Sequence, residues 1–124
     1  MPISVLIVDD SRLARRQLQR SLPKEWDIEV STAADGVEAM AAIHEGKGEL
    51  VFLDLTMPEM DGYQVLAAIK EQKLEVTVIV VSADVQVEAR QRVMALGALE
   101  FIKKPVDIEK LGAILNQFGF IVLA

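Results

Sequence analysis

Cysteine is absent from this 124-residue sequence, and no apolar run approaches the roughly 20 residues that a membrane-spanning helix needs. Without cysteine the chain has neither a disulfide framework nor a thiolate metal site. The opening residues, MPISVLIVDD, lack the basic segment of a secretory signal peptide and reach two aspartates too early for one. These absences predict a cytoplasmic protein with no attachment to a membrane.

Basic residues are outnumbered by acidic ones, 13 against 19, which leaves a net charge of -6. An acidic protein repels the phosphate backbone of nucleic acids, so direct nucleic-acid binding by this domain is disfavoured. The one histidine, His44, falls on a polar part of a predicted helix. We interpret it as a surface residue rather than as a phosphoryl donor.

The length suits one domain and is too short for two, and 52% apolar residues are ample for a core. No repeat, low-complexity tract or linker interrupts the chain. We therefore predict a single domain over residues 1–124, with its core at about 3–118. The apolar tail at 119–124 should not hang in water. It leaves three alternatives open: packing on its own domain, contact with a second copy, or the start of a linker or further domain.

Short β-rich apolar runs alternate with helical patterns along the chain. Ser11 is placed to cap the first helix, and Asp35 followed by Glu38 resembles a capping box for the second. The predicted strands are 3–8, 27–33, 50–53, 76–81 and 99–102. The first two predicted helices are 12–22 and 36–45. Apolar stripes mark the other three: Val65, Leu66 and Ile69 in the third helix, and Ala89, Val93 and Leu96 in the fourth, which Gly97 closes. The stripe of the fifth helix is Ile108, Leu111, Leu115 and Phe118, and Gly119 closes it.

Five strands that alternate with five helices indicate right-handed crossovers and a parallel sheet covered on both faces. The predicted fold class is therefore α/β, a doubly wound sheet. In open sheets of this kind the ligand site lies at the carboxyl ends of the strands. Functional residues should accordingly follow the strands.

Polar side chains follow four of the five predicted strands. Because parallel strands end at the same edge of a sheet, these side chains should meet there. They are Asp9 and Asp10 after the first strand, Asp54 after the third, Ser82 after the fourth, and Lys103 and Lys104 after the fifth.

This set of groups predicts a phosphoryl-accepting site. Three crowded carboxylates repel one another, and a hard cation such as Mg²⁺ removes that conflict. A cation, an ammonium and a hydroxyl together form a receptor for an oxyanion, as in phosphoryl transfer. Asp54 then becomes a carboxylate nucleophile. Taken singly, each of these residues is more simply explained as a cap, a turn or a solvated loop residue, so the hypothesis depends on their conjunction.

The segments VLIVDDS, LDLTMPEMDG, VIVVSAD and FIKKP, in this order, resemble the receiver domain of bacterial response regulators, and the single-domain chemotaxis type in particular. The resemblance covers about residues 3–118. It implies a flavodoxin-like sheet of strand order 2-1-3-4-5 with five helices. It also implies a two-component phosphoacceptor that catalyses only its own phosphorylation and dephosphorylation.

The resemblance assigns roles within the acidic site. It implies that Asp54 is the phosphoacceptor. It also implies that Asp9, Asp10 and Asp54 bind Mg²⁺, with the backbone carbonyl of Thr56 as a further ligand. Lys104, which directly precedes a proline, matches the family's lysine that pairs with the phosphoryl group.

Further positions match the part of the family that transmits the signal. Ser82 takes the place of the switch hydroxyl, and Phe101 that of the switch aromatic, which is often a tyrosine. Lys103 matches no functional position and is interpreted as solvated. Thr56 and Asp84 fall where the family tunes dephosphorylation, but they do not predict its rate.

The implied partners are a sensor histidine kinase or a histidine phosphotransfer protein as donor, and a downstream target or output domain. The output surface would be the fourth helix, fifth strand and fifth helix. A cluster of basic residues on the first helix is interpreted either as a solvated face or as a docking surface for the donor. These residues are Arg12, Arg15, Arg16, Arg20 and Lys24.

A phosphohydrolase with an aspartate nucleophile is the alternative function, since it would use Asp54 and Mg²⁺ in the same way. Such enzymes normally carry a second aspartate two residues after the nucleophile, where this chain has Thr56. A nucleotide- or flavin-binding module would need a glycine-rich first turn, and the segment DDSRLAR supplies acid instead.

Overall fold

The computed structural model describes residues 2–84 and 86–121. Within this part of the chain, five parallel strands form one sheet in the order β2-β1-β3-β4-β5, and five helices flank it. The predicted fold class and strand order are confirmed. The elements are β1 (Ile3–Val8), α1 (Arg12–Ser21), β2 (Ile28–Ala33), α2 (Gly36–His44), β3 (Leu50–Leu53), α3 (Gly62–Glu71), β4 (Thr77–Ser82), α4 (Val87–Ala95), β5 (Glu100–Lys103) and α5 (Ile108–Gln117).

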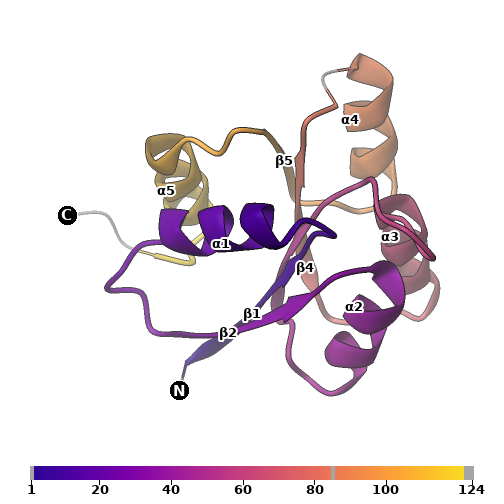
Figure 1. Ribbon diagram of the computed structural model, residues 1–124, viewed down its shortest axis with the longest axis horizontal. Coiled ribbons are helices and arrows are strands. Elements are labelled where there is room, and N and C mark those ends of the chain that lie inside the picture. Colours follow the sequence, from indigo (N-terminus) through magenta and orange to yellow (C-terminus); the bar gives the residue numbers. More distant parts are fainter. Residues whose placement is uncertain (1, 85, 122–124) are drawn as a thin grey trace.

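The sheet separates two layers of helices, with α1 and α5 on one face and α2, α3 and α4 on the other (Figure 1). Side chains alternate along each strand, so every inner strand supplies both layers. In β1, Val5 and Ile7 pack toward α1 and α5, whereas Leu6 and Val8 pack toward the other three helices. The inner strands are therefore apolar at nearly every position, as strands covered on both faces must be.

Local capping differs in part from the prediction. Asp35 caps α2 by accepting a hydrogen bond from the Glu38 N–H at 2.8 Å, but the Glu38 carboxylate accepts from Ala34 N at 3.3 Å rather than from Asp35 N. The predicted capping box at this helix is thus only half formed. A complete one lies at α3, where Asp61 and Gln64 each accept from the other's backbone N–H at 2.9 Å.

Two strands lie one residue later than predicted. β4 ends at Ser82 and β5 at Lys103, because the parallel pairing of these strands continues until Ser82 lies opposite Lys103. Both residues therefore belong to the sheet itself rather than to the loops after it. None of the helices in residues 2–84 and 86–121 has the length and apolar character needed to cross a membrane.

The described part of the apolar tail packs on its own domain. Phe120 and Ile121 lie against the core on the α1 and α5 side, and the Phe120 ring meets Trp26 edge-on with 6.5 Å between ring centroids. The described part of the tail thus follows the first alternative, while a second copy or a following linker or domain stays open. The predicted tail also includes residues 122–124, which lie outside the described residues, and the predicted domain limits stay a prediction.

The predicted apolar stripe of α5 is only half buried. Leu111 and Leu115 are fully buried, but Ile108 is 64% exposed and Phe118 is 37% exposed. The two exposed residues lie at the ends of the helix, outside the stretch that packs on the sheet. The spacing of the stripe was predicted correctly, and its length was overestimated.

Replacing Leu111 with Ala should lower the free energy of unfolding by about 2–5 kcal/mol, because a fully buried side chain is removed from the core. Replacing Ile108 with Ala is the matched control and should change it by no more than about 0.5 kcal/mol. Urea unfolding followed by Trp26 fluorescence measures both. Equal losses for the two variants would contradict the described packing of α5.

Candidate functional site

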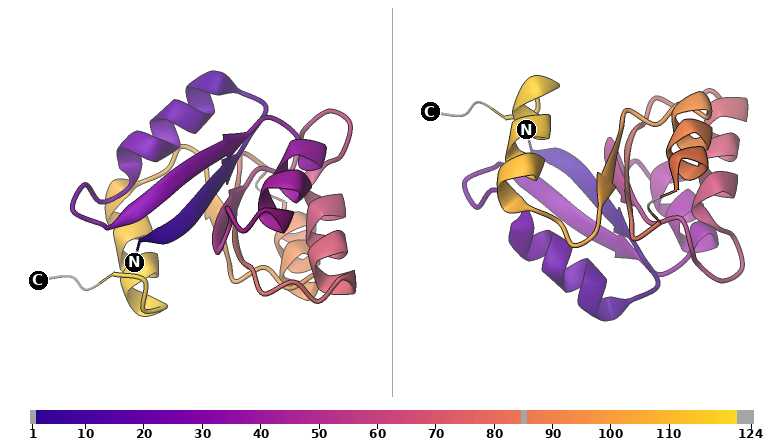
Figure 2. Two further views of the ribbon diagram at one scale, coloured as in Figure 1. Left: turned by 90° about the horizontal axis from the view of Figure 1, so that it is seen from below. Right: turned by 90° about the horizontal axis from the view of Figure 1, so that it is seen from above.

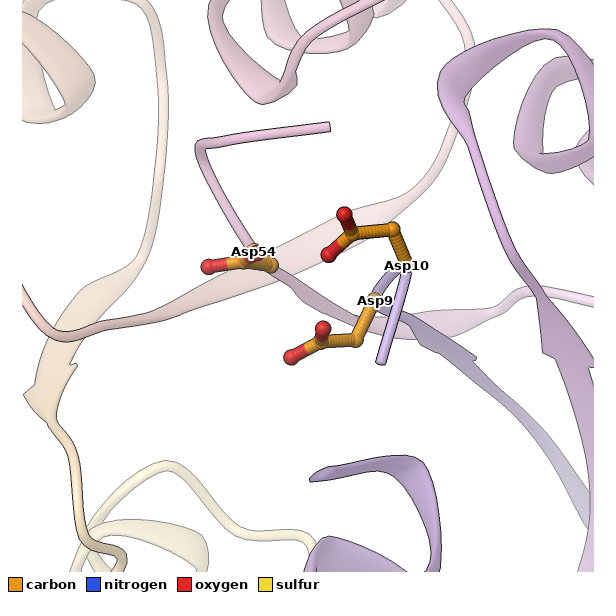
Figure 3. A group of neighbouring side chains, drawn as sticks. All are labelled: Asp9, Asp10 and Asp54. Atoms are coloured by element: carbon orange, nitrogen blue, oxygen red, sulfur yellow. The ribbon is translucent and has the colours of Figure 1, made fainter. Parts of the chain in front are cut away.

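The carboxyl edge of the sheet brings Asp9, Asp10 and Asp54 together. β1 and β3 are neighbours with Val8 opposite Leu53, so the residues that follow them lie side by side. A carboxylate oxygen from each of the three aspartates lies within 4.8 Å of one from each of the others (Figure 3). Asp9 and Asp54 are buried, whereas Asp10 is exposed.

The donor set of this cluster suits a hard divalent cation. All the candidate ligands are carboxylate oxygens, which Mg²⁺ prefers, and the exposed Asp10 leaves a side from which water reaches the site. The three charges also need a counter-ion more than a typical surface cluster does, because two of them are buried. Thr56 lies exposed in the loop after β3, and its role as a carbonyl ligand stays a prediction.

Lys104 enters the site from the end of β5. Its Nζ lies 2.6 Å from Asp9 Oδ2 and 3.4 Å from Asp54 Oδ1. Its backbone N–H donates to the Ser82 carbonyl at 2.9 Å, which fixes the residue to the end of β4. The neighbouring Lys103 is exposed, as interpreted from the sequence.

One lysine does not fully compensate the buried acid. Burial raises the pKa of Asp54, and the charge of Asp9 raises it further, despite the opposing effect of Lys104. For Lys104, burial disfavours the ammonium, but its hydrogen bond to Asp9 and the charges of Asp54 and Asp9 outweigh burial and raise its pKa. Lys104 therefore stays charged, and the site still favours an additional cation.

Arg15 holds the turn that carries the acidic pair, a role that the sequence did not reveal. Its guanidinium donates to the backbone carbonyl of Asp9 at 2.7 Å, and the Ser11 N–H donates to Asp9 Oδ1 at 2.9 Å. Ser11 also caps α1 as predicted. The available signal was the position of Arg15 one turn after this cap, since helical side chains lean toward the start of their helix.

The predicted switch residues share one face of the sheet. Ser82 is buried, and its Oγ accepts a hydrogen bond from the Asp84 N–H at 3.1 Å. Because Val80 lies opposite Phe101 in the ladder, Ser82 and Phe101 are diagonal neighbours on the face that packs against α4. Phe101 is half-buried and lines a cavity of about 540 Å³ formed by α4, β5 and α5.

A second cavity of about 460 Å³ adjoins the acidic site, between α1 and the segment that follows β5. Asp9, Asp54 and Lys104 line one end of it, and Ala14 and Leu18 of α1 line the side. The acid and the lysine are therefore reached through an open approach beside α1.

Comparison with known proteins gives a consistent result. A family model described as "Response regulator receiver domain" matches residues 5–116. The chain is 43% identical over 109 residues to protein-glutamate methylesterase/protein-glutamine glutaminase 2 of Koribacter versatilis, which covers 86% of this chain and 30% of that protein. It is 34% identical over 111 residues to response regulator MprA of a Mycobacterium species, with 90% and 48% covered. The chain thus spans half or less of the length of these two relatives.

A solved structure shares the fold closely. A chain of the CheX–CheY–BeF3–Mg²⁺ complex from Borrelia burgdorferi superimposes with a TM-score of 0.85 at 36% identity, over 96% of this chain and 90% of that one. The chemotaxis protein CheY4 of Vibrio cholerae also superimposes, with a TM-score of 0.82 at 29% identity over 94% of this chain and 98% of that one, which agrees with the chemotaxis-type resemblance of the sequence.

Replacing Asp54 with Asn should make the protein more stable at neutral pH in Mg²⁺-free buffer. The fold disfavours the charged carboxylate, and its raised pKa lies above the ordinary 3.8. The wild-type protein therefore gains stability from the neutral acid at low pH and loses it as the pH rises through the raised pKa. The advantage of the variant should be small below pH 3.8 and grow above it.

Urea unfolding across this pH range measures the effect, with Asp107→Asn as the control because Asp107 is an exposed helix cap that Asn can replace. A variant that is less stable than wild type at neutral pH would show that the surrounding groups already compensate the charge of Asp54.

Proposed function

The chain belongs to the response regulator receiver domain family, and we propose that Asp54 is the residue at which it accepts a phosphoryl group. Domains of this family are phosphoacceptors of two-component signalling and not separate enzymes. The observation that carries the proposal is the burial of Asp54 between two further carboxylates and the ammonium of Lys104, at the carboxyl edge of the sheet. This surrounding supports a nucleophilic role for Asp54 over that of a turn residue.

In the proposed reaction, a carboxylate oxygen of Asp54 attacks the phosphorus of a phosphohistidine. The phosphorus–nitrogen bond breaks, and its electron pair leaves with the imidazole, so that an acyl phosphate forms on Asp54. Asp9, Asp10, Asp54 and the Thr56 carbonyl would hold Mg²⁺, which would supply positive charge for the carboxylates and the phosphoryl oxygens. The ammonium of Lys104 supplies a further fixed positive charge.

The Ser82 hydroxyl is suited to the product state. Its oxygen already accepts from the Asp84 N–H, which leaves its own O–H free to donate to a phosphoryl oxygen. The phosphoryl group adds about two negative charges and three acceptor oxygens at this edge. Ser82 and Lys104 are the donors that would meet them.

The proposed donor is a histidine kinase or a histidine phosphotransfer protein that docks on α1. Arg12, Arg16 and Arg20 are exposed and four positions apart, so they lie along one face of this helix. In the described residues none of the three takes part in an ion pair. A basic face beside an acidic site suits a partner with an acidic surface.

The proposed output is a change in affinity for a target or output domain at the face of α4, β5 and α5. Movement of Ser82 toward a phosphoryl group would empty space behind it, and the diagonal neighbour Phe101 is placed to turn inward and fill that space. Phe101 carries no hydroxyl, so the coupling is steric and apolar.

Incubation with Mg²⁺ and acetyl phosphate should add one phosphoryl group per chain, detected by mass spectrometry and labile to base as an acyl phosphate. Asp54→Asn should take up none, while the control Asp107→Asn should label as wild type does. Labelling of Asp54→Asn at the wild-type level would disprove the assignment. Continuous release of phosphate from small phosphate esters, without a labelled chain, would instead support the phosphohydrolase.

Replacing Ser82 with Ala should leave the labelling of Asp54 possible but uncouple it from Phe101. Fluorine NMR of protein that contains fluorophenylalanine reports the ring environment, and Phe101→Tyr, which should be tolerated, identifies its signal. Addition of beryllium fluoride with Mg²⁺ should shift the Phe101 signal in wild type and not in Ser82→Ala. An unchanged signal in the wild-type protein would rule out the steric switch.

A further inference from the structure

The loop between β3 and α3 carries Asp54 and Thr56 and is anchored at its own end by Gly62. The Gly62 N–H donates to the Leu55 carbonyl at 3.0 Å. A Cβ at Gly62 would lie 2.4 Å from the Asp54 carbonyl oxygen, so only glycine permits this approach. The end of the loop is thereby fixed against its beginning.

The outer part of the same loop is anchored from a different element. Gly36, the first residue of α2, donates its N–H to the Met60 carbonyl at 3.0 Å. A Cβ at Gly36 would lie 2.4 Å from that oxygen and 2.7 Å from Met60 Cβ, distances that a side chain does not tolerate. Figure 2 shows the loop arching beside the start of α2.

The helix itself gives no reason for a glycine at this position. The glycines with positive φ in the described residues are Gly46, Gly97 and Gly119, and Gly36 is not one of them. Alanine would suit the helical backbone better than glycine does. The close approach of Met60 is therefore what requires Gly36 to lack a side chain.

The segment between the two anchors holds a strained turn. Met60 N donates to the Pro58 carbonyl at 2.7 Å, and Glu59 between them has a φ of 66°, in the left-handed region that disfavours its side chain. Thr56, Pro58 and Glu59 are all exposed, whereas Met57 is buried and packs this stretch of the loop against the core. Strained backbone persists only where its surroundings fix it, and the Gly36 hydrogen bond is such a restraint.

We infer that Gly36 is a positioning residue for the metal site: it fixes the loop that presents the Thr56 carbonyl to the aspartate cluster. The inference rests on the proposed function, because it concerns the Mg²⁺ ligands assigned there. Gly36 is not among the residues that would hold the ion or the phosphoryl group. It acts through Met60, and a side chain at this position displaces the loop that supplies the backbone ligand.

The test compares Gly36→Ala with Gly112→Ala. Both glycines lie in helices without positive φ, but a Cβ at Gly112 would meet nothing within 4 Å. Isothermal calorimetry with Mg²⁺ alone gives the dissociation constant, at a temperature where urea unfolding shows each variant to be folded. Gly36→Ala should raise this constant roughly tenfold, as the loss of groups that orient metal ligands does. Gly112→Ala should leave it within about twofold of wild type.

A measurement on the wild-type protein covers the case in which Gly36→Ala does not fold. The amide resonance of Gly36 should shift on titration with Mg²⁺, whereas that of Gly112 should not, because only Gly36 is bonded to the site loop. Two results would overturn the inference: a folded Gly36→Ala variant with wild-type affinity for Mg²⁺, or a Gly36 amide resonance that does not shift when Mg²⁺ is added.

The failure of the inference is distinguishable from that of the proposed function. If wild type binds Mg²⁺ and labels at Asp54 while Gly36→Ala binds the ion equally well, only the role of Gly36 is wrong. If wild type neither binds Mg²⁺ nor labels, the proposed function fails and the inference fails with it.

Discussion

Three carboxylates share one edge of the sheet with a single lysine, and two of the three are buried. Lys104 contacts both buried acids, yet the pKa of Asp54 remains raised because burial and the charge of Asp9 outweigh it. The edge is thus left with an excess of negative charge. A divalent cation resolves this excess, so the need for Mg²⁺ and the proposed reactivity of Asp54 follow from the same electrostatic conflict.

The rest of the fold serves to maintain this crowding. Parallel strands place the residues after β1 and β3 side by side, and the buried apolar runs within them supply stability that opposes the cost of the charges. The surrounding elements then hold individual groups: Arg15 of α1 fixes the Asp9 carbonyl, and Gly36 of α2 fixes the outer loop through Met60. Both layers of helices therefore reach the site, although neither supplies a carboxylate.

The site is also connected to a distant surface. Ser82 ends β4, and its ladder partner Lys103 ends β5 next to Lys104, so the proposed movement of Ser82 would be felt in β5 directly. Phe101 stands on the same face and lines the cavity between α4 and α5. Domains of this family interact with kinases and downstream targets, and the proposed coupling through Phe101 requires no polar contact beyond the site itself.

The sequence by itself determined the alternation of strands and helices, because apolar runs, capping residues and glycine stops act over a few neighbouring residues. It also determined which residues follow the strands, since a parallel sheet sends them to one edge. For this reason Asp9, Asp54 and Ser82 could be selected before their geometry was known. The strand order came from the family resemblance rather than from periodicity.

Only the tertiary structure decided which groups contact one another. From the residues alone either lysine after the fifth strand was a candidate, and the pairing of β5 with β4 decides that Lys104 meets the acids while Lys103 stays in solvent. The sequence likewise did not reveal three further features: the exposure of Ile108, the bond from Arg15 to Asp9, and the contact of Gly36 with Met60. The bond from Arg15 to Asp9 is local, and the structure decided only its geometry. The contact of Gly36 with Met60 joins segments that local sequence patterns do not relate, and the distance between such segments is set by packing.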